Sequence, residues 1–477
     1  MRRGRDKTDP SGIARHPVDE VLPAGQLGAF GLQHVLAMYA GAVAVPLIVG
    51  AALELSAQDL AYLINADLFT CGIATLIQTL GLWRTPVGIK LPIIQGCTFA
   101  AVTPMILIGT KNGGLPAIYG SIIVAGTITF LISPYFSKLI RYFPPVVTGT
   151  VITIIGLSLL PVAVNWARGG NDADPDYGSI KNIALAAGVL LLILLFQRFL
   201  RGFLGRIAIL LGLIVGTLVA IPLGFTDFSS VADADVVGVT TPFHFGAPTF
   251  HLAAIVSMVI VMLVCMTETT GDILAIGQIV DKPITSDDLT RGLRADGLST
   301  AVGGVLNAFP YTAYAQNVGL VGLTGVRSRY VVATAGGILV VLGLFPKLGE
   351  IVAAIPQPVL GGAGLALFGA VAASGIKTLS KVDYEGNSNL VVVAVALAIG
   401  LIPIGAPGFY DDFPQGFQII LNSGISAGSI AAVLLNYFFN ETGRPRPDDA
   451  TAAPVPPPAP VVAEPVVAED ERRTPSS

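Results

Sequence analysis

Two acidic residues in the middle of an apolar run are the strongest chemical signal in the chain. Glu268 and Asp272 lie within the run VMLVCMTETTGDILAIG, four residues apart, so both side chains would occupy one face of a helix. Two carboxylates this close in a medium of low dielectric repel each other, so we expect one of them to hold a proton near neutral pH. A carboxyl that gains and loses a proton is what proton coupling requires, and we interpret Glu268 as functional.

Other polar side chains interrupt apolar runs in the same way. They are Gln33, His34, Asn65, Asp67, Asp296, Gln316 and Asn317. Polar groups in such surroundings are costly, so each one needs either a structural partner or a function. Both readings stay open for Asn65, Asp67 and Asn317, while a structural role is favoured for His34.

Two of the apolar runs have the composition of broken helices. They are LPIIQGCTFAAVTPM (Leu91–Met105) and PYTAYAQNVGLVGLTG (Pro310–Gly325). Each has a proline, residues that suit a strand, a glutamine with Gly or Asn, and then small residues. We predict a short extended piece followed by a half-helix in each, whose free backbone N–H groups could donate to a substrate carbonyl.

The elements that position these residues must be membrane helices. Of the 477 residues, 53% are hydrophobic and only 12% are charged, whereas soluble domains carry about 25% charged residues. This composition excludes an ordinary cytoplasmic enzyme and excludes disorder over most of the chain. The net charge of −4 argues against a nucleic-acid partner, and three scattered cysteines offer neither a disulfide framework nor a metal cluster.

The apolar runs predict a polytopic, all-α membrane protein with 14 transmembrane segments. The runs begin near residues 29, 59, 92, 115, 143, 180, 204, 251, 290, 315, 329, 357, 388 and 416. We expect a basic cytoplasmic tail over 1–25 with no cleavable signal peptide, a membrane domain over 26–440, and a disordered cytoplasmic tail over 441–477, which is rich in Pro, Ala and Glu.

The distribution of basic residues predicts the orientation. With a cytoplasmic N-terminus and 14 spans, the outside loops contain only Lys111, Arg168, Lys181 and Lys347, and the remaining 23 of the 27 Lys and Arg residues lie inside. This positive-inside bias predicts that both termini are cytoplasmic. An error of one span would reverse every later loop and destroy the pattern.

Two similar segments suggest an internal repeat. KLIRYFPPVVTG begins at Lys138, and KLGEIVAAIPQPVLGG begins at Lys347. Aligning Pro145 with Pro358 places the first on an inside loop and the second on an outside loop, so the halves would be seven spans each with opposite topology. Inverted repeats are typical of secondary transporters, whose substrate site lies near the midplane where broken helices meet. Chance similarity between Pro/Gly-rich helix starts is the alternative.

The second broken run resembles the signature of the nucleobase–ascorbate transporter family, also called nucleobase–cation symporters. The matching stretch is Gln316 to Gly325, QNVGLVGLTG. Four further features fall in the family's order: the Gln33-His34 pair, the Gly-Cys-Thr-Phe of span 3, the Glu-x-x-x-Asp of span 8, and the Ala-Asp-Gly around Asp296. The resemblance covers about residues 25–440.

The resemblance implies two inverted seven-span repeats, short antiparallel β-strands in broken spans 3 and 10, and a homodimer in the cell membrane. It implies a core domain of spans 1–4 and 8–11 and a gate domain of spans 5–7 and 12–14. It also implies proton-coupled uptake of a purine base, either xanthine or uric acid. Such a transporter would need no cofactor or metal. Sodium as the coupling ion stays open.

The resemblance also assigns residues. Glu268 and Gln316 would bind the base through side chains, and Phe99 and Ala315 would offer backbone N–H groups, with Tyr314 and Phe99 near the ring. His34, Asp272, Asp296 and Asn317 would support the site or the coupling. Gln316 and Thr98 resemble the purine branch, whereas Val318 departs from the Asn common in xanthine and urate carriers and leaves the substrate open.

Several alternatives stay open at this stage. One is a carrier of uracil or another nucleobase, and another is a carrier of inorganic anions with the same architecture. The anion carrier is disfavoured because the acid at 268 is present and no Arg or Lys lies near Gln316 in the sequence. A membrane-embedded enzyme would need a nucleophile–base pair or a metal cluster, which the four histidines do not supply. A facilitated-diffusion channel would not accumulate substrate against a gradient.

Overall fold

The fold is described from a computed structural model, which defines residues 16–136, 140–226, 228, 231–232, 234–386 and 388–442. Most of the expected 1–25 and 441–477 tails lies outside the described residues, as does Lys138 of the first repeat segment. Each of the fourteen predicted apolar runs contains a helix. The described chain is therefore mostly helical, as predicted.

The helices divide at residue 252 into two series. The first series is α1 (Ala24–Ala52), α2 (Ala57–Leu80), α3 (Val102–Asn112), α4 (Leu115–Ile132), α6 (Pro145–Ala167), α7 (Ile180–Phe199), α8 (Phe203–Arg206) and α9 (Ala208–Ala220). The second series is α11 (Leu252–Ile279), α12 (Ser286–Val305), α13 (Ala315–Thr324), α14 (Arg329–Gly343), α15 (Pro346–Ala353), α16 (Gln357–Leu379), α17 (Ser388–Gly405), α18 (Gln415–Leu421) and α19 (Gly424–Asn436). Short 3₁₀ turns are η1 (Pro17–Asp19), η2 (Phe99–Ala101), η3 (Ser133–Tyr135) and η4 (Ile140–Tyr142), and a π-helical turn, η5, covers Tyr437–Glu441.

Many of these helices can cross a membrane. Eight of the described helices are long and apolar enough to span a membrane. The number of candidate spans rises to ten if each of two bent helix pairs counts as one span. The bent pairs are α14 with α15, at 82°, and α18 with α19, at 79°. Helix α9 is apolar but shorter, and α3 and α13 are the half-helices of the two broken runs. The chain is therefore a multi-pass membrane protein.

Glycines allow several pairs of helices to cross at close range. Helix α2 packs against α14, and α12 packs against α4. A Cβ added at Gly72 would lie 2.5 Å from the Gly336 carbonyl oxygen, and one at Gly126 would lie 2.7 Å from the Gly297 carbonyl oxygen. Both crossings therefore bring backbone directly against backbone, which is how small residues hold membrane helices together without a hydrophobic driving force.

Two three-residue strands lie at the centre of the molecule. β1 (Gln95–Cys97) pairs antiparallel with β2 (Tyr311–Ala313), with Gly96 opposite Thr312. Thr269 on α11 holds this ribbon, because its hydroxyl accepts the Ala313 N–H at 3.1 Å. The ribbon joins the two helix series at the position where both runs break.

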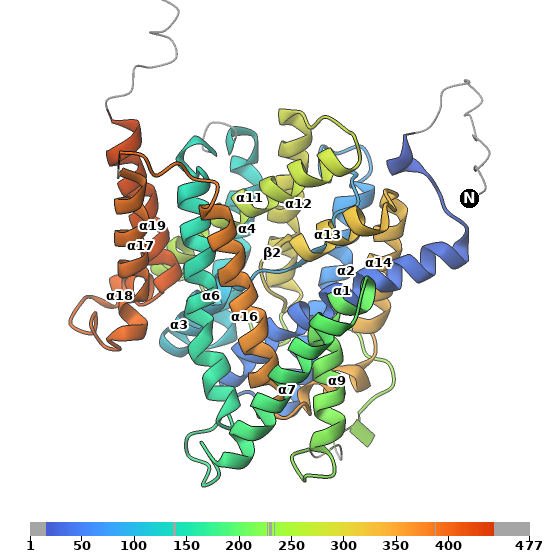
Figure 1. The fold of residues 1–477 in the computed structure, drawn as a ribbon. Helices are drawn as coiled ribbons and strands as arrows, with labels where there is room; N and C mark the ends of the chain where they lie inside the picture. The colour runs from blue at the N-terminus through green and yellow to red at the C-terminus, as the bar shows by residue number, and fades with distance from the viewer. Residues whose placement is uncertain are drawn as a thin grey trace, which may run out of the picture.

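Figure 1 shows two groups of helices beside this ribbon. Helices α1, α2 and α14 lie on one side of the molecule, and α17 and α19 lie on the opposite edge, with α6 and α16 between them and β2. Helix α16 packs along α6, and α17 packs along α19. The ribbon thus lies beside the first group and faces the α6–α16 pair.

Candidate functional site

The two breaks place backbone donors at the ends of the β1–β2 ribbon. β1 leads through Thr98 into η2, and β2 leads through Tyr314 into α13. The N–H groups of Phe99 and Ala315 have no hydrogen-bond partner among the residues that the structure describes. Free N–H groups at the start of a helical turn are available to an acceptor on a ligand.

Helix α11 brings two carboxylates beside the ribbon. Glu268 and Asp272 are both half-buried, and within the described part of the chain neither makes a hydrogen bond or an ion pair. The neighbouring Thr269 is fully buried and bonds to β2, which fixes this turn of α11 against the second break. Glu268 is therefore positioned by its neighbour while its own oxygens stay free to accept from a ligand.

Gln316 is exposed at the first turn of α13, next to Ala315, which is also exposed. Its amide has no hydrogen-bond partner in the described residues. Tyr314 precedes them as the N-cap and makes no side-chain cap bond. An uncapped helix start with a free amide side chain can both donate to and accept from a planar ligand.

Tyr314 itself lies across the ribbon. Its hydroxyl donates to the Cys97 carbonyl oxygen at 2.9 Å, and a Cβ added at Gly96 would lie 2.5 Å from its ring. The ring is buried and covers one face of the strands. Its position therefore couples the conformation of β1 to the first turn of α13.

Thr98 and Phe99 connect the first break to its surroundings. The Thr98 hydroxyl accepts the Ala100 N–H at 3.2 Å and the Cys265 thiol at 3.4 Å, so it both caps η2 and contacts α11. The Phe99 ring meets Phe368 of α16 edge to face, with centroids 5.9 Å apart. Phe99 is therefore the point where the site touches the α6–α16 pair.

Asp296 forms the centre of a buried amide network. Its Oδ1 accepts the side-chain amide of Gln95 at 2.9 Å and that of Gln78 at 3.3 Å. Gln78 also donates to the Gly292 carbonyl oxygen and accepts the Ile89 N–H. Asp296 Oδ2 and Gln95 Oε1 are buried with no partner among the described residues. The network fastens β1 to α2 and α12.

His34 and Asn317 form a second buried pair. Asn317 Nδ2 lies 3.1 Å from His34 Nδ1 and donates to the His34 carbonyl oxygen at 3.0 Å. The pair links α1 to α13 one residue beyond Gln316. His34 therefore contacts the second break through Asn317, whose Oδ1 stays buried with no partner among the described residues.

One cation lies close to the second break although it is distant in sequence. A Cβ added at Gly319 would lie 2.8 Å from Nη1 of Arg206, an exposed side chain on α8. No Arg or Lys is near Gln316 in the sequence, but the fold brings this guanidinium within one turn of it along α13.

The described residues contain no group of three or more His, Cys, Asp or Glu that could hold a metal ion.

Comparison with known proteins identifies the chain's relatives. Residues 25–408 match the model of a Permease family. A nucleobase transporter from Paenibacillus larvae is 49% identical over 89% of this chain and 96% of its own length. A xanthine permease and a uric acid permease from Bacillus subtilis are 47% and 49% identical, covering 87% and 86% of this chain and 94% and 91% of their own lengths.

The chain belongs to the nucleobase–ascorbate transporter family. As a member of this family it is a permease and not an enzyme. Solved structures share its fold at low identity. The transmembrane domain of the cyanobacterial bicarbonate transporter BicA superposes with a TM-score of 0.55 at 14% identity, covering 87% of this chain and all of that domain. SLC26A9 gives a TM-score of 0.58 at 12% identity, covering 87% of this chain and 66% of its own.

In this nucleobase–ascorbate transporter the structure brings together some predicted site residues and leaves others apart. It pairs His34 with Asn317, whereas Glu268, Asp272 and Gln316 make no hydrogen bond with one another in the described chain. Sequence reasoning missed the roles of Gln78 and Gln95. A glutamine inside an apolar run was the available signal, but its partner Asp296 lies 218 and 201 residues away.

Proposed function

We propose that this permease is a secondary active transporter that takes up a purine base, xanthine or uric acid, coupled to a proton. One observation carries the proposal. Around the central ribbon, the Glu268 carboxylate, the Gln316 amide and the N–H groups of Phe99 and Ala315 are all without protein partners in the described chain. This set of acceptors and donors is open to a ligand.

The chemistry of that set matches an oxidised purine. Such a base is planar and is edged with alternating N–H donors and C=O acceptors. Glu268 would accept from ring N–H groups, Gln316 would both accept and donate, and the two backbone N–H groups would bind carbonyl oxygens. Phe99 and Tyr314 would lie near the ring, and Thr98 would set the position of the Phe99 N–H.

The relatives support the same substrate class. Proteins named for xanthine and for uric acid are similarly close to this chain, at 47% and 49% identity. The two bases differ at one carbon of the imidazole ring, which is a carbonyl in uric acid. Xanthine, uric acid or both are therefore the proposed substrates, and uracil or another nucleobase is the alternative.

We also propose that the membrane domain has fourteen spans in two inverted repeats. The packing supports this, because equivalent helices exchange partners. Pairing α2 with α12 and α4 with α14 converts the α2–α14 contact into the α12–α4 contact. The same rule converts α7–α9 into α17–α19. A repeated unit that packs across a pseudo-two-fold axis produces this exchange.

The proposed organisation follows from these repeats. Spans 1–4 and 8–11 would form the core and spans 5–7 and 12–14 the gate, within residues 26–440. The basic residues of the inside loops support cytoplasmic termini in the cell membrane, with 1–25 and 441–477 as tails. A homodimer in the lipid bilayer is proposed from the family resemblance.

The transport cycle would use the open carboxylates. The outward-facing protein would take up a proton at or near Glu268 and bind the base, with Asp272, Asp296, His34 and Asn317 supporting the site. The core would then move against the gate, and base and proton would leave to the cytoplasm. Sodium in place of the proton is an outcome that the experiment below distinguishes.

Uptake of labelled xanthine in cells that lack their own purine permeases tests the proposal. We expect accumulation above the external concentration, competition by uric acid, weak competition by hypoxanthine and uracil, and collapse with an uncoupler. Dependence on external sodium instead would replace the proton. Absence of xanthine and urate uptake, or equilibration that no uncoupler affects, would overturn purine symport.

A further inference from the structure

A short segment before α1 is docked on the end of the first helix group. We define it as the N-terminal strap, residues 16–20, which contains η1. Val18 is 2% exposed, although it lies only five residues before the Pro23 cap of α1. The strap therefore contributes a buried side chain and is part of the packed structure.

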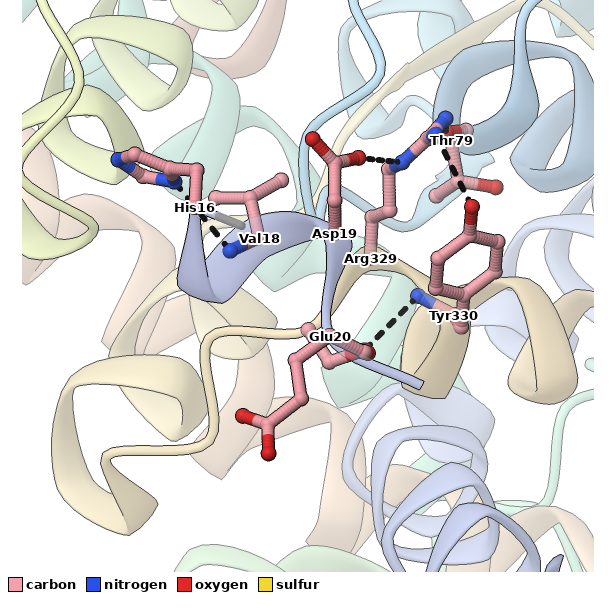
Figure 2. Close-up of polar contacts among 8 residues, drawn as sticks. His16, Val18, Asp19, Glu20, Thr79, Arg329 and Tyr330 are labelled. Atoms are coloured by element: carbon pink, nitrogen blue, oxygen red, sulfur yellow. Dashed lines mark hydrogen bonds and ion pairs between the residues drawn. The ribbon is translucent and has the colours of Figure 1, made fainter. Parts of the chain in front are cut away.

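Polar contacts hold the strap to two helices, as Figure 2 shows. Asp19 Oδ1 accepts from Arg329 Nε at 2.7 Å, and Arg329 Nη1 donates to the Thr79 carbonyl oxygen at 3.1 Å. Ser328 Oγ donates to the Glu20 carbonyl oxygen at 2.5 Å. Arg329 is only 15% exposed, so it joins the strap, the start of α14 and the end of α2 through one guanidinium.

Val18 shares a buried apolar cluster with the segment before β1, with α11, with β2 and with α13. The other fully buried members are Ile89, Leu91, Ile93, Ile273, Ile276, Val280, Ala313, Val318 and Val321. They come from the segment before β1, the last turns of α11 after Asp272, and the β2–α13 break. Because this cluster is packed like a protein interior, a change at one member is felt by the others.

The strap has a counterpart at the other end of the same helices. The loop before α11, residues 238–251, donates from Thr249 to the Pro116 carbonyl oxygen at the start of α4. Its Phe243 N–H donates to the Val305 carbonyl oxygen at the end of α12. The strap contacts the start of α14 and the end of α2, which are the repeat equivalents of these sites. In the proposed repeats, each half therefore begins with a segment that contacts one helix of its own half and one helix of the opposite half.

We propose that the N-terminal strap is a positioning element of the purine site. The Asp19–Arg329 pair holds Val18 against the apolar cluster, and the cluster holds α13 at the angle that presents Ala315 and Gln316. The role of the strap in purine binding rests on the function proposed above. Release of the strap should loosen the base of α13 without removing any group that touches the substrate.

Charge reversal tests this proposal in the full-length protein. Asp19→Arg and Arg329→Asp each break the pair, and the double variant restores an ion pair of opposite polarity, although Thr79 loses its donor. We expect each single variant to raise the KM for xanthine about fivefold with little change in Vmax, and the double variant to recover most of the loss. Asp281→Arg is the matched control, since Asp281 pairs with the nearby Arg327 at an exposed site.

A second readout reports on α13 without substrate. Val321→Cys, in purified protein in lipid nanodiscs, is labelled with a maleimide and quantified by peptide mass spectrometry. We expect labelling at 321 to accelerate about tenfold or more in the single variants, because local opening sets the labelling rate, and to slow again in the double variant. Val332→Cys, which is equally buried on α14 but outside this cluster, controls for general unfolding.

The outcomes separate the two proposals. Unchanged KM in the single variants, or a fall of Vmax alone, would overturn the positioning role. Accelerated labelling at both 321 and 332 would also overturn it, since the strap would then hold the whole fold. If the unmodified protein transported no purine, the proposed function would fail, and the labelling at 321 would still decide whether the strap holds α13.

Discussion

The two broken segments share a plan and differ in how they end. β1 passes into the 3₁₀ turn η2. The Thr98 hydroxyl accepts the N–H of Ala100, the second residue of this turn, whereas the N–H of Phe99, the first residue, comes before this cap. β2 passes directly into α13, whose N-cap makes no side-chain bond and whose first two residues, Ala315 and Gln316, are exposed. The first break thus has a side-chain cap at Ala100 beside the free Phe99 N–H, and the second break has no side-chain cap.

The same contrast extends to the helices around the breaks. Glu268, Asp272 and Asp296 lie on α11 and α12, while the equivalent helices α1 and α2 contribute His34 and Gln78 as hydrogen-bond partners. The buried acid of α2, Asp67, accepts the Tyr311 hydroxyl of β2 at 3.1 Å. A repeated fold therefore does not imply a repeated role. The second half carries Glu268, Gln316 and the Ala315 N–H, whereas the first half contributes the Phe99 N–H together with His34 and Gln78 as hydrogen-bond partners.

The largest expected effect is at Glu268. Glu268→Gln keeps the shape but removes the charge that accepts from the base and the site for a proton, so accumulation of xanthine should fall about 100-fold or more. His34→Gln, on the equivalent helix of the first half, should reduce uptake about tenfold or less because a hydrogen-bonding amide remains. Equal losses in labelled uptake, at matched expression, would contradict the division between the halves.

The next effect concerns the first break, at Gly96 of β1. Gly96→Ala would drive a methyl group into the Tyr314 ring, so we expect a loss of about 1–3 kcal/mol of stability together with loss of uptake. The control is Gly322→Ala on α13, where the nearest atom outside the helix lies 3.5 Å from the new Cβ. Thermal unfolding in detergent measures both, and a tolerated Gly96→Ala would show that Tyr314 is not fixed by β1.

Asp296 separates support from coupling. Asp296→Leu leaves the Gln95 amide without its partner and should cost about 1–3 kcal/mol of stability. Asp296→Asn keeps an acceptor for Gln95 and should fold normally. If the carboxyl takes part in coupling, the Asn variant binds xanthine but does not accumulate it. Normal accumulation by this variant would make the network purely structural.

The smallest effect is expected at Thr98. Thr98→Val removes the hydroxyl that caps η2, which should cost about 1 kcal/mol and raise the KM several-fold. Thr98→Ser keeps the hydroxyl and should remain within about twofold of the original, since only a methyl is lost. The ratio of xanthine to urate uptake in both variants shows whether this cap sets substrate preference. An unchanged KM in Thr98→Val would remove Thr98 from the site.

Local features of the fold were predictable from the sequence. The apolar runs predicted a helix in each of fourteen places because twenty apolar residues in a membrane have few other conformations. In each broken run, the proline and the Gln-Gly or Gln-Asn pair predicted an extended piece before a half-helix. The positions of Glu268 and Gln316 beside these breaks followed from the motif.

Contacts between distant residues were not predictable. Nothing in the sequence around Gln78 and Gln95 distinguishes them from other buried amides. Only the fold brings both side chains into contact with Asp296. Arg206 is 113 residues before Gly319, so sequence distance hid the cation beside α13. The strap was predicted as part of a basic tail, because the buried environment of Val18 is created by residues that lie 71 or more positions later.

The glycine crossings at Gly72–Gly336 and Gly126–Gly297 constrain how substrate binding is converted into motion. Where backbone contacts backbone, no side chain lies between the two helices. A displacement of one helix therefore cannot be absorbed by a change of rotamer at the contact. We expect the helices on either side of these crossings to move together. Binding at the ribbon would then be transmitted through Phe99, which lies beside the ribbon and meets Phe368 of α16. We expect the two helix groups to move relative to each other at that contact.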